Sequence, residues 1–378
     1  MKKCVVVSDS FKGTVSSREI CEIAQRVIPR HFPACEVVCI PVADGGEGTV
    51  DCFIQAMGAQ RVEVTVTNAL GEKSAAAYAR IGELAIIEMA AAAGLPQVGA
   101  LRCPGTATTY GVGELIAHAV DSGCRKILLG LGGSATNDGG CGCAAALGVR
   151  FYDAAGQSFI PVGDTLGRIA RIDTAKADER LRRVEITVMC DVTTPLYGPT
   201  GAAYVFAPQK GADAEKVKSL DAGLRHFGDV IRSQYGLDVG AMPGAGAAGG
   251  MGAGCVALLG GTIQSGIDAV LDVTGFDRQL EGADLVITGE GRIDSQSADG
   301  KVISGVARRT RAKGVPLIAI AGGIADSAGA VYDIGVSAMF STDRAALPVA
   351  MLGARSPGDY EATLSDIMSL IAIAERFA

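Results

Sequence analysis

The chain has 378 residues, of which 48% are hydrophobic and 20% charged, a balance that excludes a disordered or fibrous protein. Its length exceeds that of one ordinary domain, so we expect two. The net charge is −7 and no run of basic residues occurs, which argues against a nucleic-acid or membrane partner. An anionic small-molecule substrate would have to be held by a few local donors or a bound cation.

The sequence carries no sign of export or of a membrane span. The apolar run 4–7 ends at Ser8 and Asp9, far too early for a signal peptide, and no apolar stretch approaches the roughly 20 residues that a span needs. The eleven cysteines are scattered without a C-x-x-C pair, which is typical of a reducing compartment. We therefore expect a cytoplasmic protein. Its three histidines are far apart, which disfavours a zinc site or a Ser-His-Asp triad.

Short apolar, β-branched runs recur along the chain, and many precede a segment of helical periodicity. Near-continuous apolarity indicates strands buried on both faces of a sheet that helices cover. The predicted strands are 4–7, 37–42, 84–89, 126–131, 184–189, 285–288, 317–321 and 337–340. The predicted helices begin with the capping box of Ser16 and Glu19 and continue at 108–121, 213–233, 301–312 and 362–377. The fold class is therefore α/β.

Two segments depart from this pattern. Apolar and polar residues alternate at the start of 61–82, and a turn follows at 68–71, so we expect an exposed hairpin and a domain boundary there. The segment 240–266 is rich in glycine and alanine. It is either a linker or a loop and helix packed closely on a ligand, and its apolar continuation favours the packed form.

Carboxylates and glycines follow most of the predicted strands. In open α/β sheets, ligands bind beyond the carboxyl ends of the strands, so these residues are candidates for a site. They are Asp9-Ser10, Asp44-Gly45-Gly46-Glu47, Glu88, Gly132-Gly133-Ser134, Asp191, Gly289-Glu290-Gly291 and Gly322-Gly323.

Two glycine-rich loops are candidates for phosphate binding. Gly132, Gly133 and Ser134 follow a buried strand and lead through Asp138 into an apolar helix, which suits an anion site or, alternatively, a tight turn capped by Asp138. The loop 244–249 matches G-x-G-x-x-G, but no strand precedes it, so a dinucleotide fingerprint is improbable. No P-loop sequence and no protein-kinase signature occurs.

Carboxylates in these loops have two interpretations. Asp44 with Glu47 and Glu290 with Asp294 suit Mg²⁺, which takes few protein ligands, although acidic residues beside glycine also form ordinary turns. Asp191 ends the strand at 184–189 and could accept a proton from a substrate hydroxyl, or could form the turn ahead of Pro195.

Cationic groups are few in the same loops, and phosphoryl transfer depends on such groups for positioning and charge neutralisation. The candidates are Lys12, Lys210, Arg292 and Lys301. Lys12 and Lys210 stand out because each adjoins a turn in otherwise uncharged sequence.

These motifs together resemble the bacterial glycerate kinase family of the glyoxylate and galactarate pathways. The matching segments keep one order over essentially the whole chain. They are 9–13, 41–49, 110–116, 132–140, Asp191 with Pro195 and Leu196, 208–211, 243–250 and 289–294. Two departures are minor: Ser8 stands where proline is common, and Ser297 where threonine is usual.

The resemblance implies ATP-dependent phosphorylation of D-glycerate to 2-phosphoglycerate with ATP and Mg²⁺. It implies a flavodoxin-like parallel-sheet domain built from both chain ends (1–60 and 276–378), a central inserted α/β domain (61–275), and an active site in the cleft between them.

Roles follow as hypotheses from the same resemblance. Lys12, Arg292 or Ser10 would hold the glycerate carboxylate, with Asp44 and Asp294 also binding substrate, and Asp191 would be the base. The loop with Gly132, Gly133, Ser134 and Asp138, or the loop with Gly246 and Gly249, would hold the nucleotide phosphates, and Glu47 and Glu290 would bind the metal.

Three alternatives stay open at this point. The chain could phosphorylate another small hydroxy acid, or form the 3-phosphate of glycerate. It could instead be a sensor of an organic acid or nucleotide, although a sensor has no need of a proton acceptor. The sequence does not fix the oligomeric state.

Overall fold

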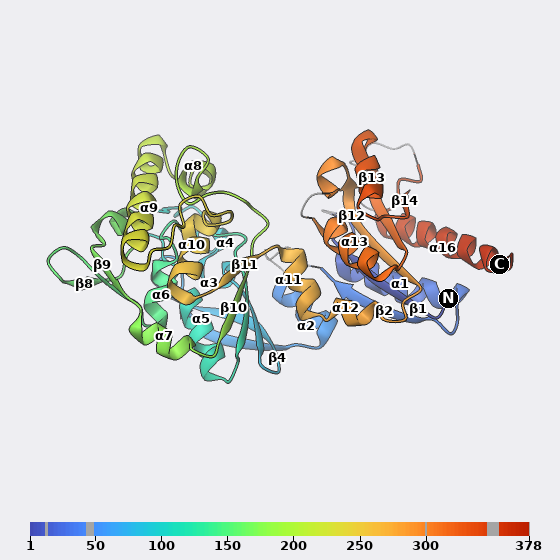
Figure 1. The fold of residues 1–378 in the computed structure, drawn as a ribbon, viewed down its shortest axis with the longest axis horizontal. Coiled ribbons are helices and arrows are strands. Elements are labelled where there is room, and N and C mark those ends of the chain that lie inside the picture. Colours follow the sequence, from blue (N-terminus) through green and yellow to red (C-terminus); the bar gives the residue numbers. More distant parts are fainter. Residues whose placement is uncertain (12–13, 43–48, 299–300, 346–354, 378) are drawn as a thin grey trace. The chain divides into compact units, whose positions relative to one another are not determined.

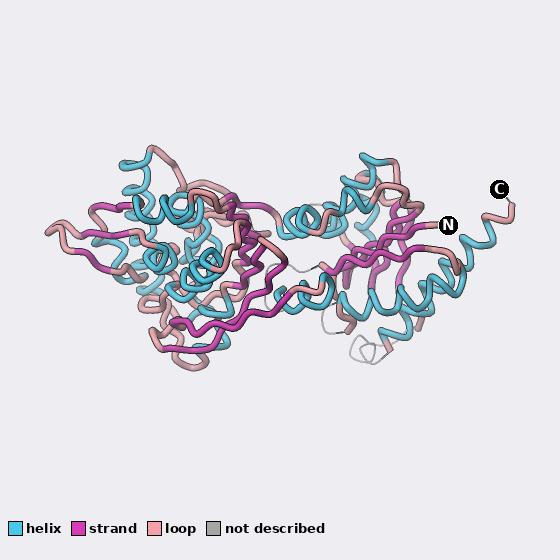
Figure 2. Tube along the Cα trace, turned by 90° about the horizontal axis from the view of Figure 1, so that it is seen from below, coloured by secondary structure: helices cyan, strands magenta, loops and turns pink. Residues whose placement is uncertain are grey.

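The computed structural model describes residues 1–11, 14–42, 49–298, 301–345 and 355–377, and it divides the chain into two compact units (Figure 1). Met1–Ala43 and Ile267–Ala378 form one, called the terminal unit below. Asp44–Gly266 form the other, the central unit. In each unit the strands, magenta in Figure 2, form a layer on which helices pack. The predicted α/β class is confirmed.

The terminal unit has a fully parallel five-stranded sheet in the order β2-β1-β12-β13-β14. This order corresponds to 2-1-3-4-5 within the unit, which is the flavodoxin-like arrangement. Its strands are β1 (Lys3–Ser8), β2 (Glu36–Pro41), β12 (Leu285–Ile293), β13 (Leu317–Ile324) and β14 (Ala338–Ser341). Strand β1, near the N-terminus, pairs with β12 from the other end of the chain. The unit is therefore built from both chain ends.

Helices cover this sheet because their apolar faces have the spacing that the sequence predicted. Ser16 and Glu19 form the expected capping box of α1 (Ser17–His31). Helices α1 and α16 (Ser356–Ala374) pack on each other and share one apolar core with β1, β12 and β13. The other helices of the unit are α11 (Gly266–Val273), which begins at the boundary, α12 (Phe276–Gln279), α13 (Val302–Lys313) and α14 (Ala330–Asp333), with the 3-10 turns η3 (Ser295–Ala298) and η4 (Asp326–Gly329).

The central unit has a mixed six-stranded sheet in the order β11-β10-β6-β5-β4-β3. Strands β11, β10, β6 and β5 run parallel, and β4 and β3 add an antiparallel hairpin where 61–82 predicted one. The strands are β3 (Gln60–Thr67), β4 (Lys73–Ile81), β5 (Leu84–Glu88), β6 (Lys126–Gly130), β10 (Glu185–Met189) and β11 (Thr262–Gln264). A separate three-stranded sheet holds β8 (Ser158–Phe159), β7 (Arg150–Tyr152) and β9 (Arg171–Asp173).

The helices of the central unit enclose one large apolar core with the parallel strands. They are α2 (Thr49–Met57), α3 (Ala90–Ala93), α4 (Leu95–Val98), α5 (Tyr110–Asp121), α6 (Cys141–Leu147), α7 (Ala175–Leu181), α8 (Ala202–Phe206), α9 (Ala214–Tyr235) and α10 (Ala247–Leu259), with the 3-10 turns η1 (Gly163–Arg168) and η2 (Pro208–Lys210). The packed form of the segment 240–266 is thus the one the structure adopts.

The units divide at 43/44 and 266/267, whereas the sequence placed the boundaries at 60/61 and 275/276. Helix α2 precedes the hairpin but packs on β4 and β5, which assigns it to the central unit. On the other side, Ile267 lies against Gly305 of α13, where a Cβ would be 2.8 Å from Ile267 Cγ1. Arg309 of α13 also pairs with Asp272, 2.7 Å away. The predicted cleft between the domains stays a prediction.

Membrane-spanning helices and disulfides are both absent from the described residues. Across them, no helix combines the length and apolarity needed to cross a bilayer. The ten cysteines whose side chains the structure describes are all free thiols, and Cys141 and Cys143 are fully buried. These two therefore act as small apolar side chains of α6.

Candidate active site

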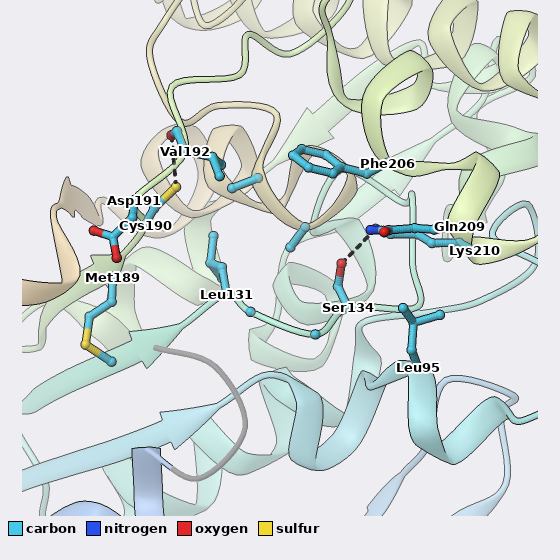
Figure 3. Close-up of a pocket in the computed structure, with 14 residues that line it drawn as sticks. Leu95, Leu131, Ser134, Met189, Cys190, Asp191, Val192, Phe206, Gln209 and Lys210 are labelled. Atoms are coloured by element: carbon cyan, nitrogen blue, oxygen red, sulfur yellow. Dashed lines mark hydrogen bonds between the residues drawn. The ribbon is translucent and has the colours of Figure 1, made fainter. Parts of the chain in front are cut away.

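The central unit has a cavity of about 270 Å³ at the carboxyl ends of β6 and β10 (Figure 3). Its walls are mostly apolar, with a small number of polar groups. The lining residues are Leu95, Leu131, Gly132, Gly133, Ser134, Met189, Cys190, Asp191, Val192, Phe206, Gln209, Lys210, Ala247 and Ala248. An apolar cavity with a few converging polar groups is the usual form of a small-molecule site.

The loop after β6 supplies backbone donors to this cavity. Gly133 has φ +72°, in the left-handed region that favours glycine, and its carbonyl accepts a bond from the Leu95 amide at 2.9 Å. Within the described part of the chain, the amides of Gly132 and Gly133 have no hydrogen-bond acceptor. Adjacent unengaged amides in a turn are suited to an anionic oxygen.

Lys210 brings a buried cationic group to the same loop. Its side chain is 1% exposed, and its Nζ donates to Ser134 Oγ and to the Thr136 carbonyl, each at 2.7 Å. Burial disfavours the charged form and lowers the pKa of Lys210 to about 7, although the nearby Asp138 opposes the shift. The dashed line between Lys210 and Ser134 in Figure 3 marks the bond from Nζ to Oγ.

Asp138 is an internal anchor of the loop and does not line the cavity. Its fully buried carboxylate accepts bonds from the amide and hydroxyl of Thr109, each at 2.8 Å, and from the amides of Gly140 and Gly142. Burial raises the pKa of Asp138, and these four bonds oppose that rise. The carboxylate therefore ties the start of α5 to the start of α6.

The second glycine loop serves backbone packing. The Gly246 amide donates to the Thr194 carbonyl at 3.0 Å, and the Gly249 carbonyl accepts from the Gly139 amide at 3.0 Å. A Cβ on Gly249 would lie 2.2 Å from the Thr136 carbonyl oxygen. Gly249 thus lets α10 approach the loop after β6, and Gly246 packs on the loop after β10. Ala247 and Ala248 between them line the cavity.

Asp191 lines the cavity from the end of β10. Its side chain is exposed, and its Oδ1 accepts a bond from the Gly266 amide at 2.7 Å. Figure 3 shows Asp191 and Lys210 on opposite sides of the cavity. A carboxylate and a lysine thus line the same small cavity, and the rest of its lining is mostly apolar.

The terminal unit has its own cavity of about 470 Å³ at the carboxyl ends of β12, β13 and β14. Arg292 lines it and is exposed, whereas Ser10 does not line it. The Ser10 amide instead donates to Asp9 Oδ1 at 2.7 Å. The lining is Phe11, Thr14, Gly291, Arg292, Gly322, Gly323, Ile324, Thr342, Asp343, Ser356 and Asp359.

Glu290 is a buried carboxylate in β12, close to the end of the strand that borders this cavity. It is 7% exposed, and it accepts a bond from the Ser297 hydroxyl. Burial raises the pKa of Glu290, and the negative charges of Asp9 and Asp294 add to that rise, while Ser297 and Lys301 oppose it. Asp294 is part of a local turn, with its Oδ1 accepting from the Gln296 amide at 2.9 Å.

Comparison with known proteins places this arrangement in a family. The sequence model of the Glycerate kinase family matches residues 4–372. The chain is 43% identical over 376 residues to a glycerate kinase of Bacillus subtilis, covering 99% of this chain and 98% of that protein. It is 45% identical over 343 residues to the glycerate 2-kinase of Escherichia coli, covering 90% of each.

The chain belongs to the glycerate kinase family. A crystal structure described as glycerate kinase 2 from Salmonella typhimurium LT2 matches with a TM-score of 0.87 and 39% identity over 99% of both chains. The family resemblance drawn from the sequence is confirmed, and the chain is a kinase that takes ATP as phosphate donor.

The structure brings only some of the predicted site residues together. Gly132, Gly133, Ser134 and Asp191 line the cavity of the central unit, and Arg292 lines that of the terminal unit. Asp138, Gly246 and Gly249 support the first cavity from behind, and Glu290, Asp294 and Ser10 lie at strand ends outside the second lining. Lys12, Asp44 and Glu47 lie outside the described residues.

Lys210 is the cavity residue whose burial could not be predicted from the sequence. It stood out as a lysine in an uncharged turn, but nothing in the sequence said that its ammonium would be buried. The signal was its position two residues after Pro208 and directly before Gly211, which begin the 3-10 turn η2 and form its left-handed end.

Proposed function

We propose that this glycerate kinase transfers the γ-phosphate of ATP to the C2 hydroxyl of D-glycerate in the cytoplasm, yielding ADP and 2-phosphoglycerate. One observation carries the proposal: the central cavity combines two unengaged glycine amides, a buried lysine and a carboxylate. Phosphoryl transfer depends on positioning and on electrostatic stabilisation, and these groups provide both. The free cysteines suit a reducing compartment.

The loop after β6 is the better of the two glycine loops for the phosphates. The amides of Gly132 and Gly133 face no acceptor in the described chain, whereas the amide of Gly246 is taken by the Thr194 carbonyl. Ser134 adds a hydroxyl at the cavity wall. The nucleotide phosphates therefore bind at Gly132, Gly133 and Ser134.

Asp191 accepts the proton of the C2 hydroxyl. As the hydroxyl oxygen attacks the γ-phosphorus, the bond from that phosphorus to the β,γ-bridging oxygen breaks, ADP leaves, and the proton moves to the carboxylate. The bond from the Gly266 amide engages Oδ1 and orients the carboxyl group. A positioned carboxylate base of this kind contributes about 10² to 10⁴ in rate.

Arg292 binds the carboxylate of glycerate in the terminal unit. Its guanidinium is exposed at a cavity wall and can form a forked pair with a carboxylate. Ser10 is a weaker candidate, because the structure directs its amide to Asp9. The roles predicted for Lys12 and Asp44 concern residues outside the described chain.

Magnesium enters the proposal with the nucleotide as MgATP. The described residues include no group of three histidine, cysteine or carboxylate side chains able to hold a metal by themselves. Mg²⁺ needs only one or two carboxylates when phosphates and water supply the other oxygens. Glu290 fits as one such residue, since Asp9 and Asp294 add negative charge around it. The ion would neutralise charge on the phosphate oxygens.

The alternatives from the sequence differ in what the same protein would do with ligands. A kinase for another hydroxy acid keeps the chemistry and changes the acceptor, and a 3-phosphate product changes only the attacking hydroxyl. A sensor would bind without turnover, but it has no use for a carboxylate at the cavity wall. The relatives named as glycerate kinase and glycerate 2-kinase favour glycerate and its C2 hydroxyl.

The test is ADP release from MgATP with D-glycerate, L-glycerate, a three-carbon dicarboxylic hydroxy acid, or no acceptor. We expect release that depends on D-glycerate, and a product whose ³¹P spectrum matches 2-phosphoglycerate. A rate of ADP release that does not depend on D-glycerate would contradict the proposal. The spectrum of 3-phosphoglycerate would overturn the choice of hydroxyl alone.

A further inference from the structure

Lys210 has one more donor than the protein uses. A lysine ammonium carries three N–H groups, and within the described chain Nζ has two acceptors, Ser134 Oγ and the Thr136 carbonyl. The side chain is 1% exposed, so its ammonium has little contact with bulk water. Lys210 also lines the cavity that holds Gly132 and Gly133. A hydrogen-bond acceptor bound in that cavity would therefore satisfy the third N–H group of the ammonium.

The neighbouring charges do not supply that acceptor. Asp138 attracts the ammonium electrostatically, but its two oxygens already accept four hydrogen bonds from Thr109, Gly140 and Gly142. Arg102 packs on the same turn through its bond to the Gln209 carbonyl and is itself cationic. Cys190 and Asp191 are the other titratable groups at the cavity wall.

Because the ammonium is buried and has only two acceptors in the described chain, the protein without ligand favours the neutral amine, and this agrees with a pKa of about 7 for Lys210. A neutral amine keeps two N–H groups, which are enough for Ser134 and Thr136. Above neutral pH, the protein without ligand therefore needs no third partner at this position.

We propose that Lys210 is the phosphate-binding cation of the central cavity and that it takes up a proton from solvent when a nucleotide phosphate binds. The inference rests on the proposed function, which puts the phosphates at Gly132, Gly133 and Ser134. The phosphate oxygen accepts the third N–H of the ammonium, and its negative charge stabilises the protonated form. The lysine thereby both braces the loop and recognises its ligand.

The sign of the pH dependence follows from this coupling. The pKa of Lys210 is higher in the complex than in the free protein, so its contribution to affinity is complete below the free pKa of about 7. The contribution is lost as the pH rises toward the pKa of the complex. In that window the affinity falls by up to about tenfold per pH unit.

The experiment is titration calorimetry of the full chain with ADP and Mg²⁺ near about pH 8, in two buffers that differ in ionisation enthalpy. The wild type should take up about 0.9 proton per ADP, because a group with a free pKa of about 7 is mostly neutral at that pH. Uptake below about 0.2 proton would overturn the proposal, whether or not any variant folds.

Two variants separate recognition from bracing. Lys210→Met should bind ADP about tenfold to a hundredfold more weakly, without proton uptake. Ser134→Ala removes one of the two bonds of Nζ but leaves the lysine, so its proton uptake should persist. Lys218→Met, at a side chain that is 63% exposed, is the matched control and should behave as the wild type does. Proton uptake by Lys210→Met equal to that of the wild type would contradict the proposal.

A parallel titration with D-glycerate alone identifies the anion. Uptake with glycerate but not with ADP would show that the lysine serves a carboxylate, and it would overturn the assignment to phosphate. The binding measurement needs no turnover, so its outcome is independent of the acceptor test above. Glycerate-dependent turnover without proton uptake refutes only the role of Lys210, and uptake without such turnover refutes only the proposed reaction.

Discussion

Both units have a cavity at the carboxyl ends of parallel strands, for which we propose anionic ligands, but the charged side chains of the two units differ in burial. In the central unit Asp138 is fully buried with four hydrogen bonds and Lys210 is 1% exposed with two, whereas Asp191 at the cavity wall is exposed. In the terminal unit the cationic group at the cavity, Arg292, is exposed, and Asp343 and Asp359 line the same cavity.

Because of this difference in burial, we expect the two cavities to respond differently to a ligand. We expect the buried Lys210 to gain a proton when an anion binds, because burial lowers its pKa to about 7. An exposed guanidinium stays charged and contributes a fixed attraction. We therefore expect pH-dependent recognition in the central unit and pH-independent recognition in the terminal unit.

The largest effect should come from the carboxylate of the central cavity. Asp191→Asn keeps an oxygen for the Gly266 amide but removes the proton acceptor. We expect kcat to fall by a factor of about 10² to 10⁴ with little change in KM for glycerate or ATP. Steady-state kinetics measure it. Near wild-type turnover in a variant that still binds both substrates would remove Asp191 as the base.

Backbone packing behind the same cavity should dominate stability. Gly249 has φ +69°, and a Cβ there would lie 2.2 Å from the Thr136 carbonyl oxygen, so Gly249→Ala should lower the free energy of unfolding by about 2–5 kcal/mol. Denaturant unfolding measures the change.

Gly260 offers the matched control at the other end of α10. Its φ is +66°, but a Cβ there would meet open space. Gly260→Ala should therefore show only the backbone penalty of about 1–2 kcal/mol. Equal losses in the two variants would mean that close packing on the loop after β6 contributes nothing.

A smaller effect is expected from the exposed cation of the terminal cavity. Arg292→Ala should raise KM for glycerate about tenfold to a hundredfold, with KM for ATP unchanged, since a hydrogen bond to a charged group contributes about 1.5–3 kcal/mol. Arg308→Ala, at a side chain that is 63% exposed, is the control. A rise in KM for ATP instead of glycerate would reverse the ligand assignment of the terminal unit.

The smallest effect contrasts two glutamates of the terminal unit by their pKa shifts. The pKa of Glu290 is raised by burial, so its ionised form opposes folding, and stability falls as the pH rises through its folded pKa. Glu290→Gln should therefore raise the melting temperature at neutral pH. Hydrogen bonds from Ser16 lower the pKa of Glu19, so its ionised form stabilises the fold. Glu19→Gln should therefore lower the melting temperature at neutral pH. Thermal unfolding of both variants measures the two changes, and shifts of the melting temperature with the same sign would contradict the account.

The sequence predicted the fold well because its main signals were local. Apolar runs such as 4–7 and 126–131 are strands β1 and β6, and the alternation at 61–82 is the hairpin of β3 and β4. The boundaries were displaced because α2 and Ile267 are assigned by packing partners that lie far away in the sequence.

The candidate site was harder to predict because burial and hydrogen-bond partners are properties of the folded chain. The loop 244–249 looked like a ligand loop, yet Gly246 and Gly249 pack on the backbones of Thr194 and Thr136. Lys210 looked like one of several loop cations, and only the fold shows that its Nζ is enclosed by Ser134 and Thr136.

The assignment of Lys210 to the nucleotide and of Arg292 to glycerate is the central claim, and one crossed binding experiment tests it most directly. The affinities of wild type, Lys210→Met and Arg292→Ala are measured by calorimetry for ADP with Mg²⁺ and, separately, for D-glycerate. The account predicts that Lys210→Met loses affinity for ADP alone and that Arg292→Ala loses affinity for glycerate alone. Loss of the same ligand in both variants would contradict it.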